Sequence, residues 1–285
     1  MRYEAPGSVD EAVTLLADAN GAARILAGGT DLLVQLRAGL ISPDIVVSIK
    51  NISETQGITA DGDGFCIGAS VSGAEMGENE ALTSAWPGVV EGTELIGSTQ
   101  IQSRATMAGN LCNASPAADS VPALIAAGAT CTIVGPNGRR EALVAEIPTG
   151  PGQTSLGNGE FVVNFKLPAR PANASDAYLR MIPRTEMDIA IVGAGVNLVL
   201  ASDGTCTEAC VVLGAVGPTT ITVADAAAAL IGSKVDDNAL AAVKNASSAA
   251  ATPIDDKRGT VEYRTKVAGV LAARAAAIAA DRARS

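Results

Sequence analysis

Between two helical patterns, the chain reads Gln100-Ile101-Gln102-Ser103-Arg104-Ala105-Thr106-Met107-Ala108-Gly109-Asn110-Leu111-Cys112-Asn113-Ala114-Ser115-Pro116-Ala117-Ala118-Asp119. These residues are mostly small or polar, and long ordered loops of this kind inside compact domains are usually functional. Asn and Asp side chains can bind sugar hydroxyls as well as cap a helix. Asp119 therefore has two open roles, since a helix is expected from Val121 to Ala127.

A second turn of interest lies earlier, at Ala27-Gly28-Gly29-Thr30-Asp31. It joins a short strand, Arg24–Ala27, to a helix from Asp31 to Ala38 that Thr30 is expected to cap. Such a junction presents unpaired backbone N–H groups and the positive end of a helix dipole, which suits a phosphate. Paired glycines let an anion approach the main chain. The alternative is a plain strand-to-helix turn. With the first loop, this turn predicts a site for a diphosphate and a ribose.

The composition excludes several classes of protein. The 285 residues carry a net charge of −10, which argues against a nucleic-acid footprint. No apolar run reaches the length of about 18 residues that a membrane-spanning helix needs. No signal peptide is visible behind Met1-Arg2, so we expect a cytoplasmic protein that does not span the membrane.

The chain contains no histidine, which excludes Ser-His-Asp and Cys-His catalysis and His-ligated metals. The five cysteines lack paired short spacing, and an iron–sulfur cluster usually needs four thiolates. We therefore expect neither catalytic acid–base residues nor metal ligands. Any redox chemistry has to come from a bound organic cofactor.

The order of the predicted elements indicates an α+β fold. The first fifty residues read as an α/β unit, and a hairpin is expected around Asp61–Gly64. In the last third, three strand-like runs precede three helices, which describes a small α+β lobe of antiparallel strands followed by helices. We predict lobes at 1–52, 53–172 and 173–285, with a linker at 168–174.

The two loops resemble those of the FAD-binding medium subunit of molybdenum hydroxylases, of the carbon monoxide dehydrogenase and xanthine dehydrogenase type. That family has a two-lobed FAD-binding domain of the PCMH or vanillyl-alcohol-oxidase type. It shows an Ala-Gly-Gly segment early in the chain and, near residue 100, a segment similar to Gln100–Asp119. Three further segments resemble the family: Glu160–Val162, Ala177–Arg180 with Met187–Ala190, and Leu213–Thr219. Ala108 departs from the usual Gly-Gly pair, which puts the tightness of binding in question if its φ is positive.

The resemblance implies roles for individual residues. Backbone groups of both loops wrap the FAD diphosphate, Asn113 and Asp119 bind the ribose or adenine side, and Val162 and Tyr178 lie against the isoalloxazine ring. The complete set implied to bind the cofactor is Ala27, Gly28, Gly29, Thr30, Asp31, Ile101, Thr106, Met107, Ala108, Gly109, Asn110, Asn113, Asp119, Val162 and Tyr178.

The resemblance also implies partners. Molybdopterin is expected on a large subunit and two [2Fe–2S] clusters on a small subunit, from which electrons reach FAD on this chain and then an external acceptor. Two alternatives stay open: a stand-alone FAD oxidoreductase of the same fold, and a non-enzymatic nucleotide-binding scaffold. The absence of histidine counts against the first alternative, because such enzymes often attach flavin through His or Cys and use His or Tyr as acid–base groups.

Overall fold

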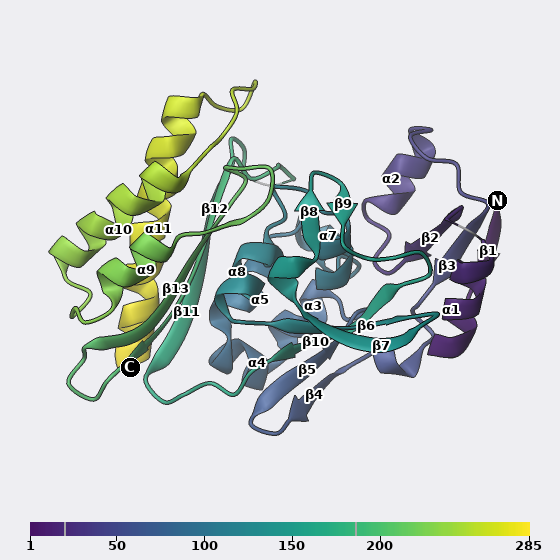
Figure 1. Ribbon diagram of the computed structural model, residues 1–285, viewed down its shortest axis with the longest axis horizontal. Coiled ribbons are helices and arrows are strands. Elements are labelled where there is room, and N and C mark those ends of the chain that lie inside the picture. The colour runs from purple at the N-terminus through teal and green to yellow at the C-terminus, as the bar shows by residue number, and fades with distance from the viewer. Residues whose placement is uncertain (20, 186) are drawn as a thin grey trace.

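A computed structural model describes residues 1–19, 21–185 and 187–285. Its N-terminal part is a three-stranded parallel sheet in the order β1-β3-β2, formed by Arg2–Glu4, Ile45–Ser48 and Ala23–Leu26. Helix α1 (Val9–Asp18) connects β1 to β2, and α2 (Leu32–Arg37) connects β2 to β3. The Ser8 hydroxyl caps α1 by accepting a hydrogen bond from the Glu11 N–H. In Figure 1 this part forms one end of the molecule, with α2 standing at its edge.

The middle part is an antiparallel sheet in the order β4-β5-β10-β6-β7. Its strands are Ile58–Asp61, Gly64–Gly68, Phe161–Leu167, Thr130–Gly135 and Gly138–Leu143. Six short helices accompany it: α3 (Gly73–Glu78), α4 (Glu80–Ala85), α5 (Pro87–Glu94), α6 (Thr99–Gln102), α7 (Met107–Cys112) and α8 (Ser120–Ala126). The remaining short elements are η1 (Ser53–Thr55), η2 (Val144–Glu146), β8 (Pro148–Gly150) and β9 (Gln153–Thr154).

The C-terminal part is a four-stranded antiparallel sheet, β11-β12-β13-β14, covered by three helices. Its elements are Ala174–Met181, Val192–Leu200, Cys206–Gly214 and Ile221–Thr222, then α9 (Ala224–Leu230), α10 (Asp237–Ala250) and α11 (Val261–Arg284). Alanines such as Ala272 and Ala276 pack α11 against this sheet, and both are fully buried. Helices α10 and α11 approach so closely that a Cβ at Gly269 would overlap the Lys244 carbonyl oxygen. Small residues therefore replace aromatic ones in this core.

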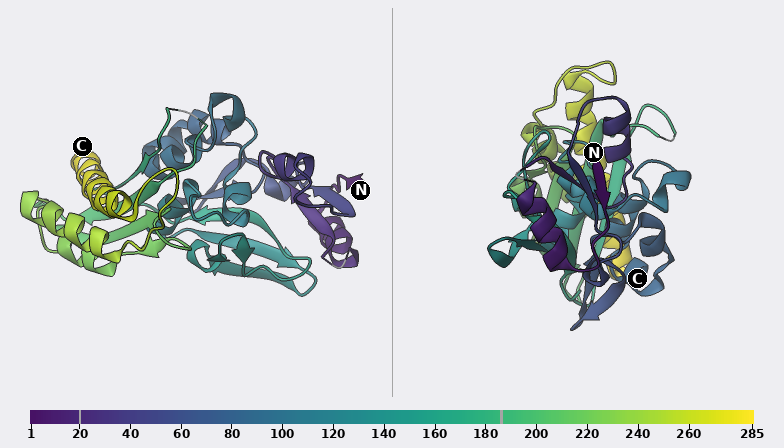
Figure 2. Two further views of the ribbon diagram at one scale, coloured as in Figure 1. Left: turned by 90° about the horizontal axis from the view of Figure 1, so that it is seen from above. Right: turned by 90° about the vertical axis from the view of Figure 1, so that its right-hand side faces the viewer.

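Buried and half-buried polar contacts join the C-terminal and middle parts. The Glu91 carboxylate on α5 accepts a hydrogen bond from the Tyr178 N–H at the start of the C-terminal sheet and pairs with Arg282 of α11. On the linker, Arg170 pairs with Asp176 at 3.0 Å, and its guanidinium lies 3.8 Å from the centre of the Trp86 ring. Because these contacts come from distant segments, they hold the two parts together; the left view of Figure 2 shows the parts side by side.

The α+β class and the strands-then-helices order of the last third are confirmed. The capping role predicted for Thr30 is wrong: α2 begins after Asp31, and no side chain accepts a capping hydrogen bond there. Within the stretch expected to be a loop, 103–119, the chain forms α7. The lobe limits at 52 and 172 stay predictions. In the part of the chain that the structure describes, no helix is long and apolar enough to cross a membrane.

Candidate functional site

A cleft of about 580 Å³ lies where the N-terminal and middle parts meet. Both glycine-containing turns line it, together with the start of β10 and the loop before it. Of the fifteen residues implied to bind the cofactor, eleven line this cleft: Ala27, Gly28, Gly29, Thr30, Asp31, Thr106, Ala108, Gly109, Asn110, Asn113 and Val162. Segments some eighty residues apart in the sequence thus share one cleft.

The two turns touch each other at Gly28. A Cβ built on Gly28 would overlap the Arg104 carbonyl oxygen and would lie 2.9 Å from the Arg104 carbonyl carbon and 3.2 Å from the Ala105 Cα. These are main-chain atoms, which cannot move aside as the end of a long side chain can. Glycine is therefore required at position 28 for the turns to meet.

The first turn leaves several N–H groups available. Gly29 has φ +81°, a left-handed conformation that favours glycine, and its carbonyl accepts the Leu33 N–H at 3.0 Å. Among the described residues, no hydrogen-bond partner is present for the N–H groups of Gly28, Gly29 and Thr30. Adjacent free N–H groups on a turn form a concave site for an anion.

The second turn opens helix α7. The Thr106 hydroxyl accepts the Gly109 N–H at 3.0 Å, while Met107 and Ala108 occupy the first two helical positions, whose N–H groups lack a partner within the helix. The Asn110 side chain makes contacts within the protein. Its Oδ1 accepts both the N–H and the hydroxyl of Ser120 and so holds the start of α8. The polar sequence of this loop thus reflects capping as well as ligand contact.

Ala108, the departure from the family pattern, lies inside α7 with a right-handed helical backbone. Its methyl group is buried and causes no backbone strain there. The concern that alanine obstructs the phosphate through a positive φ therefore does not arise.

A hydrogen bond on the cleft wall joins the segments that follow the two turns. Gln35 Nε2 of α2 donates to Asn113 Oδ1, which follows α7, at 3.2 Å. Gln35 was not among the predicted residues, and its spacing of four from Asp31 on the expected helix was the available signal. Burial raises the pKa of Asp31, the acidic residue on this wall.

The loop before β10 completes the cleft and was also missed as part of the site. Glu160 lines the cleft, accepts the Gly157 N–H at 2.8 Å, and receives two hydrogen bonds from Arg140 at 2.9 and 2.8 Å. These bonds, the Arg140 pair first, hold the pKa of Glu160 below its ordinary value. The glycines between 150 and 159 were the sequence signal for this loop.

Four predicted residues do not line the cleft: Ile101, Met107, Asp119 and Tyr178. The Asp119 carboxylate instead accepts the Tyr178 hydroxyl at 2.9 Å and pairs with Arg180 at 2.8 Å. All three side chains are buried, and burial raises the pKa of Asp119 to about 6 against the opposing effect of Arg180. This arrangement joins α8 to β11; the ribose role of Asp119 and the place of Tyr178 on the flavin ring stay predictions.

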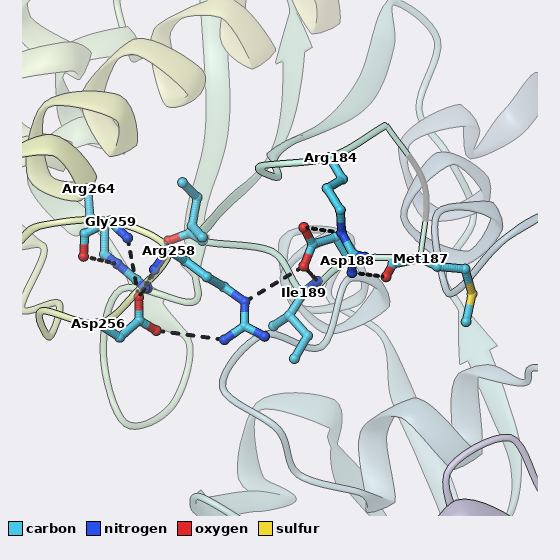
Figure 3. A network of polar contacts seen from close by, with 9 residues as sticks. Arg184, Met187, Asp188, Ile189, Asp256, Arg258, Gly259 and Arg264 are labelled. Atoms are coloured by element: carbon cyan, nitrogen blue, oxygen red, sulfur yellow. Dashed lines mark hydrogen bonds and ion pairs between the residues drawn. The ribbon is translucent and has the colours of Figure 1, made fainter.

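Asp188, which follows the family-like segment after Tyr178, contacts two neighbours in the sequence and one distant arginine. It pairs with Arg184 at 3.1 Å, accepts the Ile189 N–H at 2.8 Å, and lies 3.7 Å from Arg258. Figure 3 shows this network continuing from Arg258 to Asp256. Asp188 is therefore a structural residue of the C-terminal part.

Comparison with known proteins identifies the family. Residues 1–170 match the family described as the FAD binding domain in molybdopterin dehydrogenase, and residues 177–279 match the CO dehydrogenase flavoprotein C-terminal domain. The chain belongs to this family of FAD-binding subunits, which confirms the resemblance drawn from the two loops.

Individual relatives are similar along most of the chain. The carbon monoxide dehydrogenase medium chain of Afipia carboxidovorans is 31% identical over 283 residues, 99% of this chain and 98% of the relative. A putative xanthine dehydrogenase FAD-binding subunit of Escherichia coli is 33% identical over 221 residues, 77% of this chain and 75% of the relative. The solved structure of reconstituted CO dehydrogenase from Oligotropha carboxidovorans superimposes with a TM-score of 0.94 at 30% identity, covering 99% of this chain and 98% of that one.

The residues of the cleft fit FAD. The free N–H groups at Gly28–Thr30 and at the start of α7 suit a diphosphate. The Asn113 and Gln35 amides supply hydrogen-bonding groups, and Val162 and Ala108 supply apolar surface for a flat ring. A cleft with apolar walls and a few convergent polar groups is typical of cofactor sites.

Proposed function

We propose that this chain carries electrons within a molybdenum-containing hydroxylase: it receives them from [2Fe–2S] clusters of a partner subunit and delivers them through FAD to an external acceptor. The coarser statement, that the chain is a FAD-binding subunit of this family of multi-subunit dehydrogenases, follows from the family membership. The observation that supports the proposal is the contact of the two turns at Gly28, which places residues of both turns on the wall of one cleft.

Each turn has its own proposed task. The N–H groups of Gly28, Gly29 and Thr30 bind one phosphate of FAD, and those of Met107 and Ala108 bind the other. Such charge-assisted hydrogen bonds are the strong ones, worth about 1.5–3 kcal/mol each. Asn113, held by Gln35, binds the ribose or adenine side. Val162 packs on the isoalloxazine ring.

Bound FAD supplies the ability to exchange electrons singly with clusters and in pairs with other acceptors. The chain's own residues hold and orient the cofactor and keep water from one face of its ring. Substrate oxidation is assigned to a partner subunit, because the relatives are named as the medium chain of a carbon monoxide dehydrogenase and as a putative FAD-binding subunit of a xanthine dehydrogenase.

The test uses the chain purified together with its partner subunits. We expect a flavin absorption spectrum, FAD equimolar with this chain, and reduction of the acceptor on adding substrate. After FAD is stripped, substrate should still bleach the iron–sulfur absorbance while acceptor reduction stops, and added FAD should restore it. Undiminished acceptor reduction in the FAD-free complex would refute the relay. Substrate turnover by the isolated FAD-loaded chain would favour a stand-alone oxidoreductase instead.

A further inference from the structure

The loop before β10 places an asparagine–glycine pair on the wall of the cofactor cleft. The chain has three such pairs, Asn20–Gly21, Asn137–Gly138 and Asn158–Gly159, and Asn20 lies outside the described residues. Asn158 and Gly159 both line the cleft, and Asn158 is exposed. An asparagine loses its side-chain amide most readily before glycine, because glycine has no Cβ to shield its backbone nitrogen.

The fold of the loop requires glycine after Asn158. Gly159 has φ +78°, in the left-handed region that favours glycine. A Cβ built on Gly159 would also lie 3.0 Å from Pro136 Cγ and 3.5 Å from Ala17 Cα. A larger residue is therefore excluded at position 159 by conformation and by packing, and the reactive pair is kept.

The two groups that react with each other make no hydrogen bonds with other described residues. These groups are the Asn158 side-chain amide and the Gly159 N–H. The residues on either side are held instead. The Glu160 N–H donates to the Gly157 carbonyl at 3.1 Å, and the Glu160 carboxylate accepts the Gly157 N–H at 2.8 Å. The turn is thus fixed at its ends, while the exposed amide stays accessible to water.

The reaction of such a pair consumes only water. Hydroxide takes the proton of the Gly159 N–H, and the nitrogen attacks the side-chain carbonyl carbon of Asn158. The new N–C bond closes a succinimide ring, and Asn158 Nδ2 takes up a proton and leaves as ammonia. Water then opens the ring at either carbonyl and gives aspartate or isoaspartate. One water is used, one ammonia is released, and no electron is transferred.

We propose that Asn158 is a modification site that bound FAD protects: in the FAD-free cleft it deamidates, and the carboxylate formed there weakens FAD binding. The inference rests on the proposed function in taking this cleft as the FAD site. Deamidation adds a negative charge to a wall shared with Gly28–Thr30, whose N–H groups suit an anionic diphosphate. Bound FAD covers this wall and keeps water from the Asn158 amide. The time that the cleft stays empty therefore determines how much of the site is lost.

The pair Asn137–Gly138 provides a matched control within the same chain. It lies in the hairpin that joins β6 to β7 (Figure 1), where Gly138 pairs with Gly135 in the strand register. Asn137 is exposed like Asn158, but it is not among the residues that line the cleft. FAD should therefore slow deamidation at Asn158 and leave the rate at Asn137 unchanged.

The experiment uses the complex purified with its partner subunits, as isolated and after removal of FAD. Both samples are kept in mildly alkaline buffer, and peptide mass mapping follows the replacement of NH2 by OH at each asparagine. With FAD at about ten times its Kd, about a tenth of the sites are empty, so Asn158 should convert about tenfold more slowly than in the FAD-free sample. An equal rate at Asn158 with and without FAD would overturn the inference.

Variants test the effect on the cofactor. Asn158→Asp should bind FAD about tenfold more weakly, and the difference should shrink at high salt, whereas Asn137→Asp should bind FAD normally. FAD-free wild type that has converted at Asn158 should rebind less FAD. Asn158→Gln should rebind it fully after the same treatment, because glutamine closes the corresponding larger ring far more slowly.

Three results separate this inference from the function on which it rests. Wild-type FAD affinity in Asn158→Asp would overturn the inference. Equal loss of rebinding in wild type and Asn158→Gln would overturn it as well, since the loss would then arise elsewhere. Absence of FAD from the wild-type complex as isolated would instead refute the proposed function.

Discussion

Gly28→Ala is the substitution that bears most directly on how the site is built. The added Cβ would lie 2.9 Å from the Arg104 carbonyl carbon and 3.2 Å from the Ala105 Cα, and it would overlap the Arg104 carbonyl oxygen. Since ordinary carbon contacts are about 3.5–4 Å, the two turns must separate by roughly 1 Å or more. Overpacking of this kind costs about 1–3 kcal/mol of stability.

Separation also disturbs the N–H groups that converge on the diphosphate. Loss of one or two charge-assisted hydrogen bonds, about 1.5–3 kcal/mol each, predicts FAD affinity at least tenfold weaker. The assay is titration of FAD into the purified chain by flavin fluorescence, with thermal unfolding alongside.

Gly7→Ala serves as the control, because no heavy atom lies within 4 Å of the Cβ built there and its φ is not positive. It should leave both affinity and stability unchanged. A Gly28→Ala variant that binds FAD with wild-type affinity would show that the contact between the turns does not shape the site.

Two further substitutions test the buried and the cleft-edge carboxylates. Asp119→Asn leaves the buried Arg180 guanidinium without its ion pair, so urea denaturation should show about 3 kcal/mol less stability while FAD affinity changes little; lost FAD affinity with normal stability would restore a ribose role to Asp119. Glu160→Gln tests a pH effect: the pKa of Glu160 is lowered when folded, so its stabilisation is present above about pH 4.5 and disappears as pH falls through the folded value. The difference in urea midpoint between wild type and Glu160→Gln should therefore shrink toward pH 3, and a difference that is constant with pH would contradict the Arg140 pairing.

The sequence predicts this molecule best where local pattern and family motif agree. The strands around Val46, Phe165 and Val196 are nearly continuous apolar runs, and the order of elements in the last third follows from that pattern. The approach of the two turns was predicted through the resemblance, since periodicity alone does not bring residue 28 next to residue 104.

Other features depend on contacts that the sequence does not display. Thr30 has the residue type of a helix cap, yet α2 starts one residue later and without a side-chain cap. Asp119 has the position of a ribose ligand or a cap, but its carboxylate pairs with two residues about sixty positions further on. Gln35 reaches Asn113 across seventy-eight positions. A buried polar residue needs a hydrogen-bond partner, but the sequence does not show which residue that partner is.

The most direct measurement is an experimental structure of this chain with FAD bound. The account predicts that the N–H groups of Gly28 to Thr30 and of Met107 and Ala108 lie about 2.7–3.2 Å from oxygens of one FAD diphosphate. A diphosphate bound elsewhere, or contacted by one turn while the other faces away from it, would contradict the account.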